Sequence, residues 1–239
     1  MLLTVPIPDP RPLGWPAGLG SFGIPYRWVC IEAPIRLGKS QAVEQVRAEL
    51  SDYLAAACDT FAGGDGAGRD VAQEMIQNVR HVRQPGAHVA IPGGPLINMR
   101  DLARAPLPPA AEFAVFLADR VLQNQEVASL LDSCSLVIQE RGAFSTYVYQ
   151  CVLGGISPTL FSQVTAALTP ERPDLMILLS PGQAETGDAK AYANPPAHIL
   201  RLCAKNFALV STEGLDPKQI AAAIVEAISG RRLVLPLDR

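Results

Sequence analysis

The sequence predicts an α/β fold with three layers, in which a five-stranded parallel sheet is flanked by helices. Strand-like apolar runs alternate with helix-periodic segments along the chain, and this alternation is typical of strand–helix–strand units. Parallel sheets built from such units are covered on both faces. The 239 residues suffice for one sizeable core or at most two small ones, and they show no internal repeat.

The elements are expected in a definite order along the chain. Strands are expected at the start of residues 27–40 and at 78–83, 135–139, 173–179 and 206–211. Helices are expected over 38–57, 110–131, 143–153, 157–168 and 216–229, the last with Gly230 as its stop signal. Residues 61–69 are rich in glycine and end the first helix, while residues 85–109 are loop-rich with one short helix at most.

Three regions make up the expected domain plan. Residues 1–26 carry six prolines, which remove backbone donors and fix φ, so this stretch is expected to be an extended arm. Residues 27–230 are expected to form the folded domain, and residues 231–239 are expected to form a C-terminal tail outside it.

Composition limits the class of protein. The net charge is −3 and only 18% of the residues are charged, so a surface that coats nucleic acid is not indicated. The hydrophobic content of 49% is high for a soluble monomer and predicts a partner surface or an oligomer. No apolar run is long enough to span a bilayer, and no secretory signal is recognisable. Five cysteines without a Cys-x-x-Cys pair indicate a reducing intracellular compartment, the cytoplasm first of all.

One segment carries the pattern of a phosphate-binding loop. Residues 27–40 place an apolar strand before a short loop that ends in Gly38-Lys39-Ser40, and a helix-periodic segment follows. Backbone N–H groups at a helix N-terminus point toward an anion, and the helix dipole favours negative charge there. Lys39 would reach the outer phosphates, and the Ser40 hydroxyl would hold a magnesium ion.

Two features weigh against this interpretation. The usual pattern opens with glycine, but Ala33 stands at that position, where a Cβ would narrow the turn or crowd the phosphates. A second glycine-rich stretch, residues 63–70, imitates such a loop but carries Arg69 and Asp70 in place of lysine and serine. Because Asp70 would repel phosphates and the residues before this stretch look helical, the loop at Gly38 is preferred.

Four short motifs follow the loop. They are Arg83-Gln84-Pro85-Gly86, Phe116-Leu117-Ala118-Asp119-Arg120, Glu140-Arg141 with Tyr149-Gln150 behind it, and Arg172-Pro173-Asp174-Leu175. In this order they resemble motifs of the thymidylate kinase family of P-loop nucleoside monophosphate kinases. The resemblance covers residues 27–230 in outline and implies the three-layer fold of P-loop kinases.

The resemblance implies phosphoryl transfer to a thymidylate-like nucleotide. Phe116 would stack on the acceptor base and Arg120 would bond to the base edge, tasks that suit an aromatic face and a planar guanidinium. Arg83 and Arg141 would clamp the acceptor phosphate with bidentate hydrogen bonds. The family commonly forms dimers through helices, which implies a homodimer.

The resemblance also implies ATP and Mg²⁺ as cofactors. The residues that would contact the bound nucleotide are Gly38, Lys39, Ser40 and Gln41. The residues that would hold the magnesium ion are Ser40 and Glu140.

Three residues would act on the phosphoryl group during transfer, namely Lys39, Arg36 and Arg141. Arg36 matches an arginine that one branch of the family carries inside the loop, where it would stabilise charge on the transferred group. That branch needs no arginine in its lid, and the lid candidate at residues 181–196 contains none.

Several departures from the family pattern leave other functions open. Ile35 replaces an acidic residue that often contacts the sugar, Gln84 replaces the glutamate of the turn, and Gly142 replaces a tyrosine. One alternative is a kinase of a deoxynucleoside, because Ser145 after Glu140-Arg141 resembles the motif of the deoxynucleoside kinases. Another is a kinase that acts on a modified base in DNA, although the low charge of the chain does not favour DNA binding. Another is a retired kinase that serves as a structural subunit of a larger complex.

Overall fold

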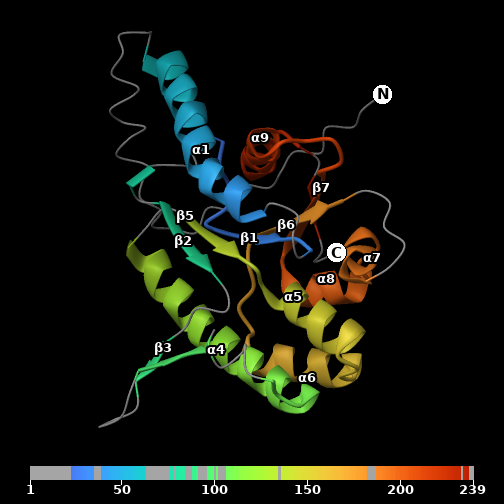
Figure 1. The fold of residues 1–239 in the computed structure, drawn as a ribbon. Coiled ribbons are helices and arrows are strands. Elements are labelled where there is room, and N and C mark those ends of the chain that lie inside the picture. Colours follow the sequence, from blue (N-terminus) through green and yellow to red (C-terminus); the bar gives the residue numbers. More distant parts are fainter. Residues whose placement is uncertain are drawn as a thin grey trace.

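Helices cover both faces of a central sheet in the computed structural model, giving three layers (Figure 1). The structure describes residues 23–34, 39–62, 76–77, 79–83, 88–90, 96–99, 101, 106–133, 136–181, 187–232 and 234–236. The strands are β1 (Trp28–Glu32), β2 (Val79–Arg83), β3 (His88–Ala90), β4 (Leu96–Asn98), β5 (Leu136–Glu140), β6 (Leu175–Ser180), β7 (Asn206–Ser211) and β8 (Leu235–Pro236). The helices are α1 (Lys39–Ala62), α4 (Pro109–Ser133), α5 (Ala143–Thr146), the π-helix η2 (Tyr147–Leu153), α6 (Pro158–Leu168), α7 (Gly187–Ala193), α8 (Ala197–Cys203) and α9 (Pro217–Ile228).

The main sheet has the strand order β2-β5-β1-β6-β7-β8. The first five strands of this order run parallel, which confirms the predicted five-stranded parallel sheet. The sixth strand, β8, pairs antiparallel with β7. This pairing lies within residues 231–239, where the sequence indicated only a tail.

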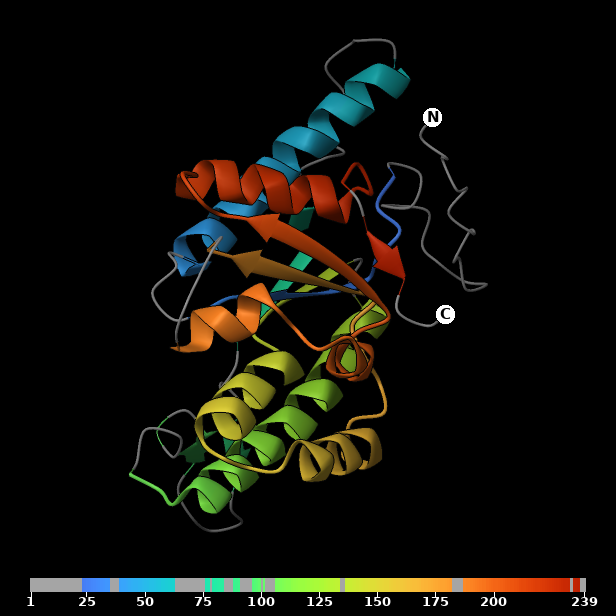
Figure 2. The same cartoon turned by 90° about the vertical axis from the view of Figure 1, so that its right-hand side faces the viewer.

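Alternate residues of β6 enter two separate core clusters, because successive side chains of a strand point to opposite faces. In β6, Leu175, Ile177 and Leu179 face the core under α1 and α9, while Met176 and Leu178 face the core over α5, η2, α6 and α8. Figure 2 shows α1 and α9 on one side of the sheet, and α4, α5 and α6 on the other. Burial on both faces explains why these strands appear as continuous apolar runs.

Specific contacts define both ends of α9, and the C-terminal one was predicted from the sequence. The Asp216 carboxylate accepts a hydrogen bond from the Gln219 backbone N–H, and the Gln219 side chain accepts one from the Asp216 N–H. This reciprocal capping box fixes the start of the helix. Gly230, expected as the stop signal, has a φ of 68°, in the left-handed region that favours glycine.

Other elements were not predicted. The loop-rich stretch 85–109 contains the antiparallel pair β3 and β4, whose three-residue strands are too short for a visible alternation. The helix expected at 143–153 is α-helical only to Thr146 and continues as η2, a π-helix of a kind often found at functional sites. The lid candidate includes α7, but residues 182–186 lie outside the described residues, as do residues 1–22 and 63–75.

Candidate functional site

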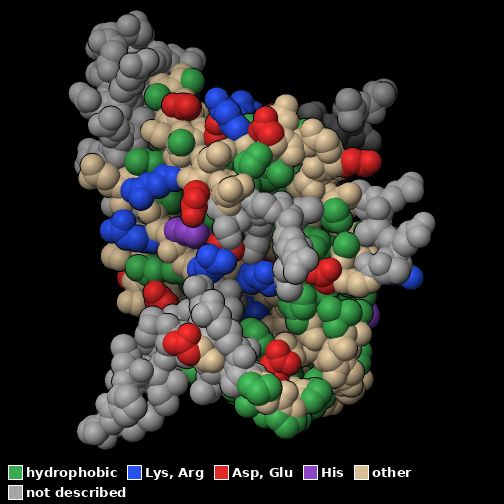
Figure 3. All heavy atoms as spheres, viewed as in Figure 1, with side chains coloured by type: hydrophobic (Ala, Val, Ile, Leu, Met, Phe, Trp, Pro, Cys, Tyr) green, Lys and Arg blue, Asp and Glu red, His purple; other side chains and the backbone are tan. Residues whose placement is uncertain are grey.

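Three charged residues gather where β1, β2 and β5 reach their carboxyl ends. β1 ends at Glu32, β2 at Arg83 and β5 at Glu140. The strand register pairs Arg83 with Glu140 and Glu140 with Ile31. On this face of the molecule, basic side chains and a histidine lie over β2 (Figure 3). Ligands of open parallel sheets bind at the carboxyl edge, so this is the candidate site.

The predicted phosphate-binding loop leaves the sheet at this edge. The strand before the loop and the helix after it are confirmed, because β1 ends at Glu32 and α1 begins at Lys39. Gln41 lies in the first turn of α1 and is exposed. Outside the described residues lie Arg36 and Gly38, together with the side chains of Lys39 and Ser40. The roles of these residues stay predictions.

Ala33, which stands where the usual loop pattern has its first glycine, is fully buried. Its side chain belongs to the core cluster that also contains Val43 and Ile224 from α1 and α9. Its φ is not positive, because Arg141 is the only non-glycine residue with a positive φ among the described residues. The backbone at this point therefore does not require glycine.

Glu32 is the main residue of the site that the sequence analysis missed. It is fully buried, and one carboxylate oxygen accepts hydrogen bonds from the Gly142 N–H at 2.6 Å and the Ser145 N–H at 3.1 Å. The other oxygen accepts from the hydroxyls of Ser145 and Tyr192. A negative charge at the N-terminus of α5 is favourable, so Glu32 caps this helix from a neighbouring strand. The sequence did contain a signal for Glu32, namely an acidic residue within an apolar strand.

A strained turn joins β5 to α5. Arg141 has a φ of 71°, a left-handed conformation that is uncommon for a non-glycine residue, and its N–H donates to the Ile31 carbonyl at 2.9 Å. A Cβ at Gly142 would come within 2.5 Å of the Cys30 sulfur and 3.0 Å of a Glu32 carboxylate oxygen. The tyrosine that the family pattern has at residue 142 therefore has no room here.

This close contact makes Gly142→Ala a sensitive test of the turn. We expect the variant to lose about 1–3 kcal/mol of unfolding free energy, because the added methyl displaces a buried sulfur or a buried carboxylate. Urea denaturation measures this loss. The double variant Gly142→Ala/Cys30→Ala should lose less unfolding free energy than the sum of the two single variants, because Cys30→Ala removes the sulfur atom nearest to the added methyl group. Additive losses would contradict the contact.

Arg83 and Glu140, which were assigned to the acceptor phosphate and the metal ion, lie against each other. The Arg83 Nε is 3.4 Å from one Glu140 carboxylate oxygen, and the His81 Nε2 is 3.9 Å from the other. Glu140 is only 1% exposed, whereas the Arg83 side chain is 49% exposed. The Gln123 amide donates to the Arg83 carbonyl at 2.7 Å and ties α4 to β2.

Arg141, also assigned to the acceptor phosphate, directly follows β5, and its side chain lies against Tyr149. Its guanidinium lies 5.5 Å from the centroid of the Tyr149 ring, a cation–π arrangement. Burial lowers the pKa of Arg141, but Tyr149, Tyr192 and Glu32 outweigh this effect and raise it above the usual value. Arg141 therefore carries a permanent positive charge, as binding a phosphate requires.

The two residues assigned to the acceptor base lie one helical turn apart on α4. Phe116 is half-buried. Arg120 is only 5% exposed, and its Nη2 donates to the Thr146 hydroxyl. Its Nε and Nη1 have no hydrogen-bond partner. Burial lowers the pKa of Arg120, while the nearby Glu32 counteracts that shift.

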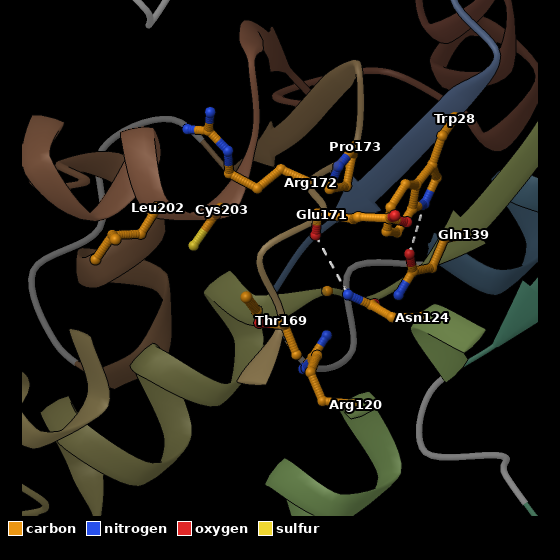
Figure 4. A pocket seen from close by; sticks show the side chains of 12 residues that line it. Trp28, Arg120, Asn124, Gln139, Thr169, Glu171, Arg172, Pro173, Leu202 and Cys203 are labelled. Carbon is orange, nitrogen blue, oxygen red and sulfur yellow. Dashed lines mark hydrogen bonds between the residues drawn. The ribbon is translucent and has the colours of Figure 1, made fainter. Parts of the chain in front are cut away.

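A cavity of about 20 Å³ lies beside Arg120, lined also by Trp28, Gln139 and Thr169. Figure 4 shows Arg120 together with these side chains, and the Trp28 indole donates to Gln139 at 2.8 Å. This volume accommodates a water-sized group and not a nucleobase. The contact of Arg120 with a base stays a prediction.

Two absences hold within the part of the chain that the structure describes. There is no cluster of three or more histidine, cysteine, aspartate or glutamate side chains that could hold a metal ion by themselves. Nor does any helix there combine the length and the apolar character that crossing a membrane requires.

The comparisons with known proteins agree on one family. A family model described as "Thymidylate kinase" matches residues 61–194, more than half of the chain. A thymidylate kinase of Nitratidesulfovibrio vulgaris (strain DP4) is 34% identical over 131 residues, which are 50% of this chain and 58% of that protein. One from strain DSM 19637 / Miyazaki F is 32% identical over 109 residues, 41% of this chain and 50% of that protein. The chain thus spans about half the length of these curated relatives.

The fold also agrees with a solved structure. The thymidylate kinase from Ehrlichia chaffeensis superposes with a TM-score of 0.54 at 18% sequence identity, covering 85% of this chain and 98% of that chain. At this identity the likeness concerns the fold alone. Because the family model covers more than half of the residues, the chain belongs to the thymidylate kinase family.

Proposed function

We propose that this chain transfers the γ-phosphoryl group of ATP, in the presence of Mg²⁺, to a thymidylate-like nucleoside monophosphate. The observation that carries this proposal is the carboxyl edge of the sheet. There Arg83, Glu140 and Arg141 gather beside the strand that leads into the predicted phosphate-binding loop. Two cations and one buried carboxylate are the charges that a phosphate acceptor and a metal–nucleotide complex require.

The nucleotide would lie at the start of α1. The first N–H groups of an α-helix have no intrahelical partner and attract phosphate. Gly38, Lys39, Ser40 and Gln41 would form this cradle, and Arg36 would reach the group in transfer. Such catalysis consists mostly of positioning and of charge stabilisation by these side chains.

Magnesium fits the charges at this edge. Mg²⁺ is usually held by one or two carboxylates, by water and by substrate phosphates, so no cluster of three acidic side chains is needed. Glu140 offers a carboxylate at the end of β5, and Ser40 would add its hydroxyl. When bound, the ion neutralises charge on the phosphates. In this structure one Glu140 oxygen lies against the Arg83 guanidinium and the other against the His81 imidazole.

The acceptor would lie between α4 and η2, which contact each other. Arg83 and Arg141 would hold its phosphate, and Phe116 would stack on its base. Buried side-chain atoms without a partner are rare in proteins, and this region has four of them. They are the Arg120 Nε and Nη1, the Gln123 Oε1 and the Gln150 Oε1. The two unpaired nitrogens of Arg120 are the donors that would bond to the base edge in the proposed complex.

A panel of acceptors tests the proposal. We would measure ADP release by the full chain with Mg²⁺ and ATP, offering dTMP, thymidine and a DNA duplex with a hydroxymethylated base. The proposal expects dTMP to be the preferred acceptor. Preference for thymidine or for the DNA would replace it with the corresponding kinase, and the absence of Mg²⁺-dependent ATP binding in calorimetry would favour a non-catalytic role.

Arg120→Ala tests the base contact separately. We expect the KM for dTMP to rise about tenfold or more while the KM for ATP changes little, because a hydrogen bond to a charged donor is lost at one substrate only. Steady-state kinetics at saturating ATP measures this change. Gln125→Ala, an exposed change on the same helix, is the matched control. An unchanged KM for dTMP would show that Arg120 serves only to pack α4.

A further inference from the structure

Helix α7 is held at two points by polar contacts with the candidate site. Near its C-terminal end, the fully buried Tyr192 hydroxyl lies 2.9 Å from the Ser145 hydroxyl and 3.5 Å from a Glu32 carboxylate oxygen. Its ring meets the Phe144 ring edge-on, with centroids 5.2 Å apart. Near its N-terminal end, Asp188 accepts a hydrogen bond from the Tyr149 hydroxyl at 2.9 Å. These contacts fix α7 against α5 and η2.

The contact of Asp188 with Tyr149 is oriented. One Asp188 carboxylate oxygen accepts from the Ala189 N–H at 2.9 Å, so the other oxygen is aimed at the Tyr149 hydroxyl. Burial raises the pKa of Tyr149 to about 12, which keeps its hydroxyl a donor at neutral pH. The direction of the Tyr149 ring is therefore set by a residue of α7.

The Tyr149 ring in turn determines where the Arg141 guanidinium lies. The guanidinium carbon is 5.5 Å from the ring centroid, within the range of a cation–π contact. Arg141 starts from a left-handed backbone, so its side chain leaves the β5–α5 turn in a direction that few residues adopt. A long side chain on such a turn loses considerable conformational freedom when it is held in place. The ring supplies a surface that holds it.

We propose that Asp188 and Tyr149 are positioning residues for Arg141, so that α7 orients the guanidinium that binds the acceptor phosphate. This inference rests on the proposed function, because it takes Arg141 as a phosphate ligand. Asp188 belongs to none of the motifs that carry the family resemblance. Its carboxylate acts through the Tyr149 hydroxyl and ring and needs no contact with the substrate.

The test compares two ligands that differ only in the phosphate. Calorimetric titrations of dTMP and of thymidine into the full chain would be done for the wild type, Asp188→Ala, Tyr149→Phe and the double variant. We expect each single change to weaken dTMP binding about fivefold, the effect of losing roughly one hydrogen bond, and to leave thymidine binding unchanged. The double variant should be no weaker than either single one, because both changes break the same contact.

Tyr147→Phe is the matched control, since it removes a hydroxyl from the same helix η2, from a ring that packs against Phe144 and Phe161. This variant should bind both ligands as the wild type does. A wild-type affinity for dTMP in both Asp188→Ala and Tyr149→Phe would overturn the inference while leaving the proposed function intact. Equal weakening of dTMP and thymidine would also overturn it, since that would show a general structural role. Failure of the wild type to bind dTMP would remove the proposed function and this inference together.

Discussion

Lys39→Ala is expected to abolish phosphoryl transfer, with turnover falling at least about a hundredfold. Lys39 is the first residue of α1, directly after the loop that leaves the carboxyl edge of the sheet. A lysine there supplies a positive charge where charge develops during transfer, and an alanine supplies nothing in its place. ADP release with dTMP as acceptor measures the loss, and calorimetry with ATP and Mg²⁺ separates a loss of binding from a loss of chemistry.

Lys218→Ala is the matched control for this prediction. Lys218 also lies in the first turn of a helix, α9, but its side chain is 78% exposed and its ammonium is 4.0 Å from the Glu49 carboxylate. Exposed ion pairs of this kind contribute little to the stability of a protein. We expect wild-type turnover from this variant. Wild-type turnover from Lys39→Ala as well would contradict the assignment of the phosphate-binding loop.

Among the variants considered for stability, Glu32→Ala is expected to lose the most unfolding free energy, about 3–5 kcal/mol. The change leaves the buried N–H groups of Gly142 and Ser145 without their acceptor and opens a cavity between β1 and α5. It also removes the negative charge from the N-terminus of α5. Urea denaturation followed by circular dichroism measures the effect.

Two further variants make this prediction specific. Glu32→Gln keeps an acceptor oxygen in the same place, so it should lose clearly less than Glu32→Ala. Glu44→Ala removes an exposed carboxylate from α1 and should stay within about 0.5 kcal/mol of the wild type. Equal losses from Glu32→Ala and Glu44→Ala would show that the buried hydrogen bonds of Glu32 do not stabilise the fold.

The main sheet and its large helices could be predicted because their signals are local. β6 appears as an apolar run since all six of its residues are buried, and α9 carries a capping box and a terminal glycine. The pair β3–β4 and the strand β8 could not be predicted, because strands of two or three residues are defined by their partners. Helices α7 and α8 are seven residues each, too short for a clear helical period.

For the candidate site, sequence motifs identified residues but not their contacts. The ends of β2 and β5 were predicted, so the meeting of Arg83 with Glu140 follows from strand register. The roles of Glu32 and Asp188 depend on residues far along the chain and on buried geometry, which no short motif contains. Residues 35–38 of the loop lie outside both the described residues and the segment 61–194 matched by the family model.

Ala33 has a consequence for how the departure of this chain from the usual loop pattern is interpreted. Its methyl group fills space between α1, α9 and the sheet, and its backbone has no need for glycine. The alanine that departs from the usual phosphate-loop pattern therefore contributes to hydrophobic packing. A search pattern that insists on glycine at this position would overlook this chain.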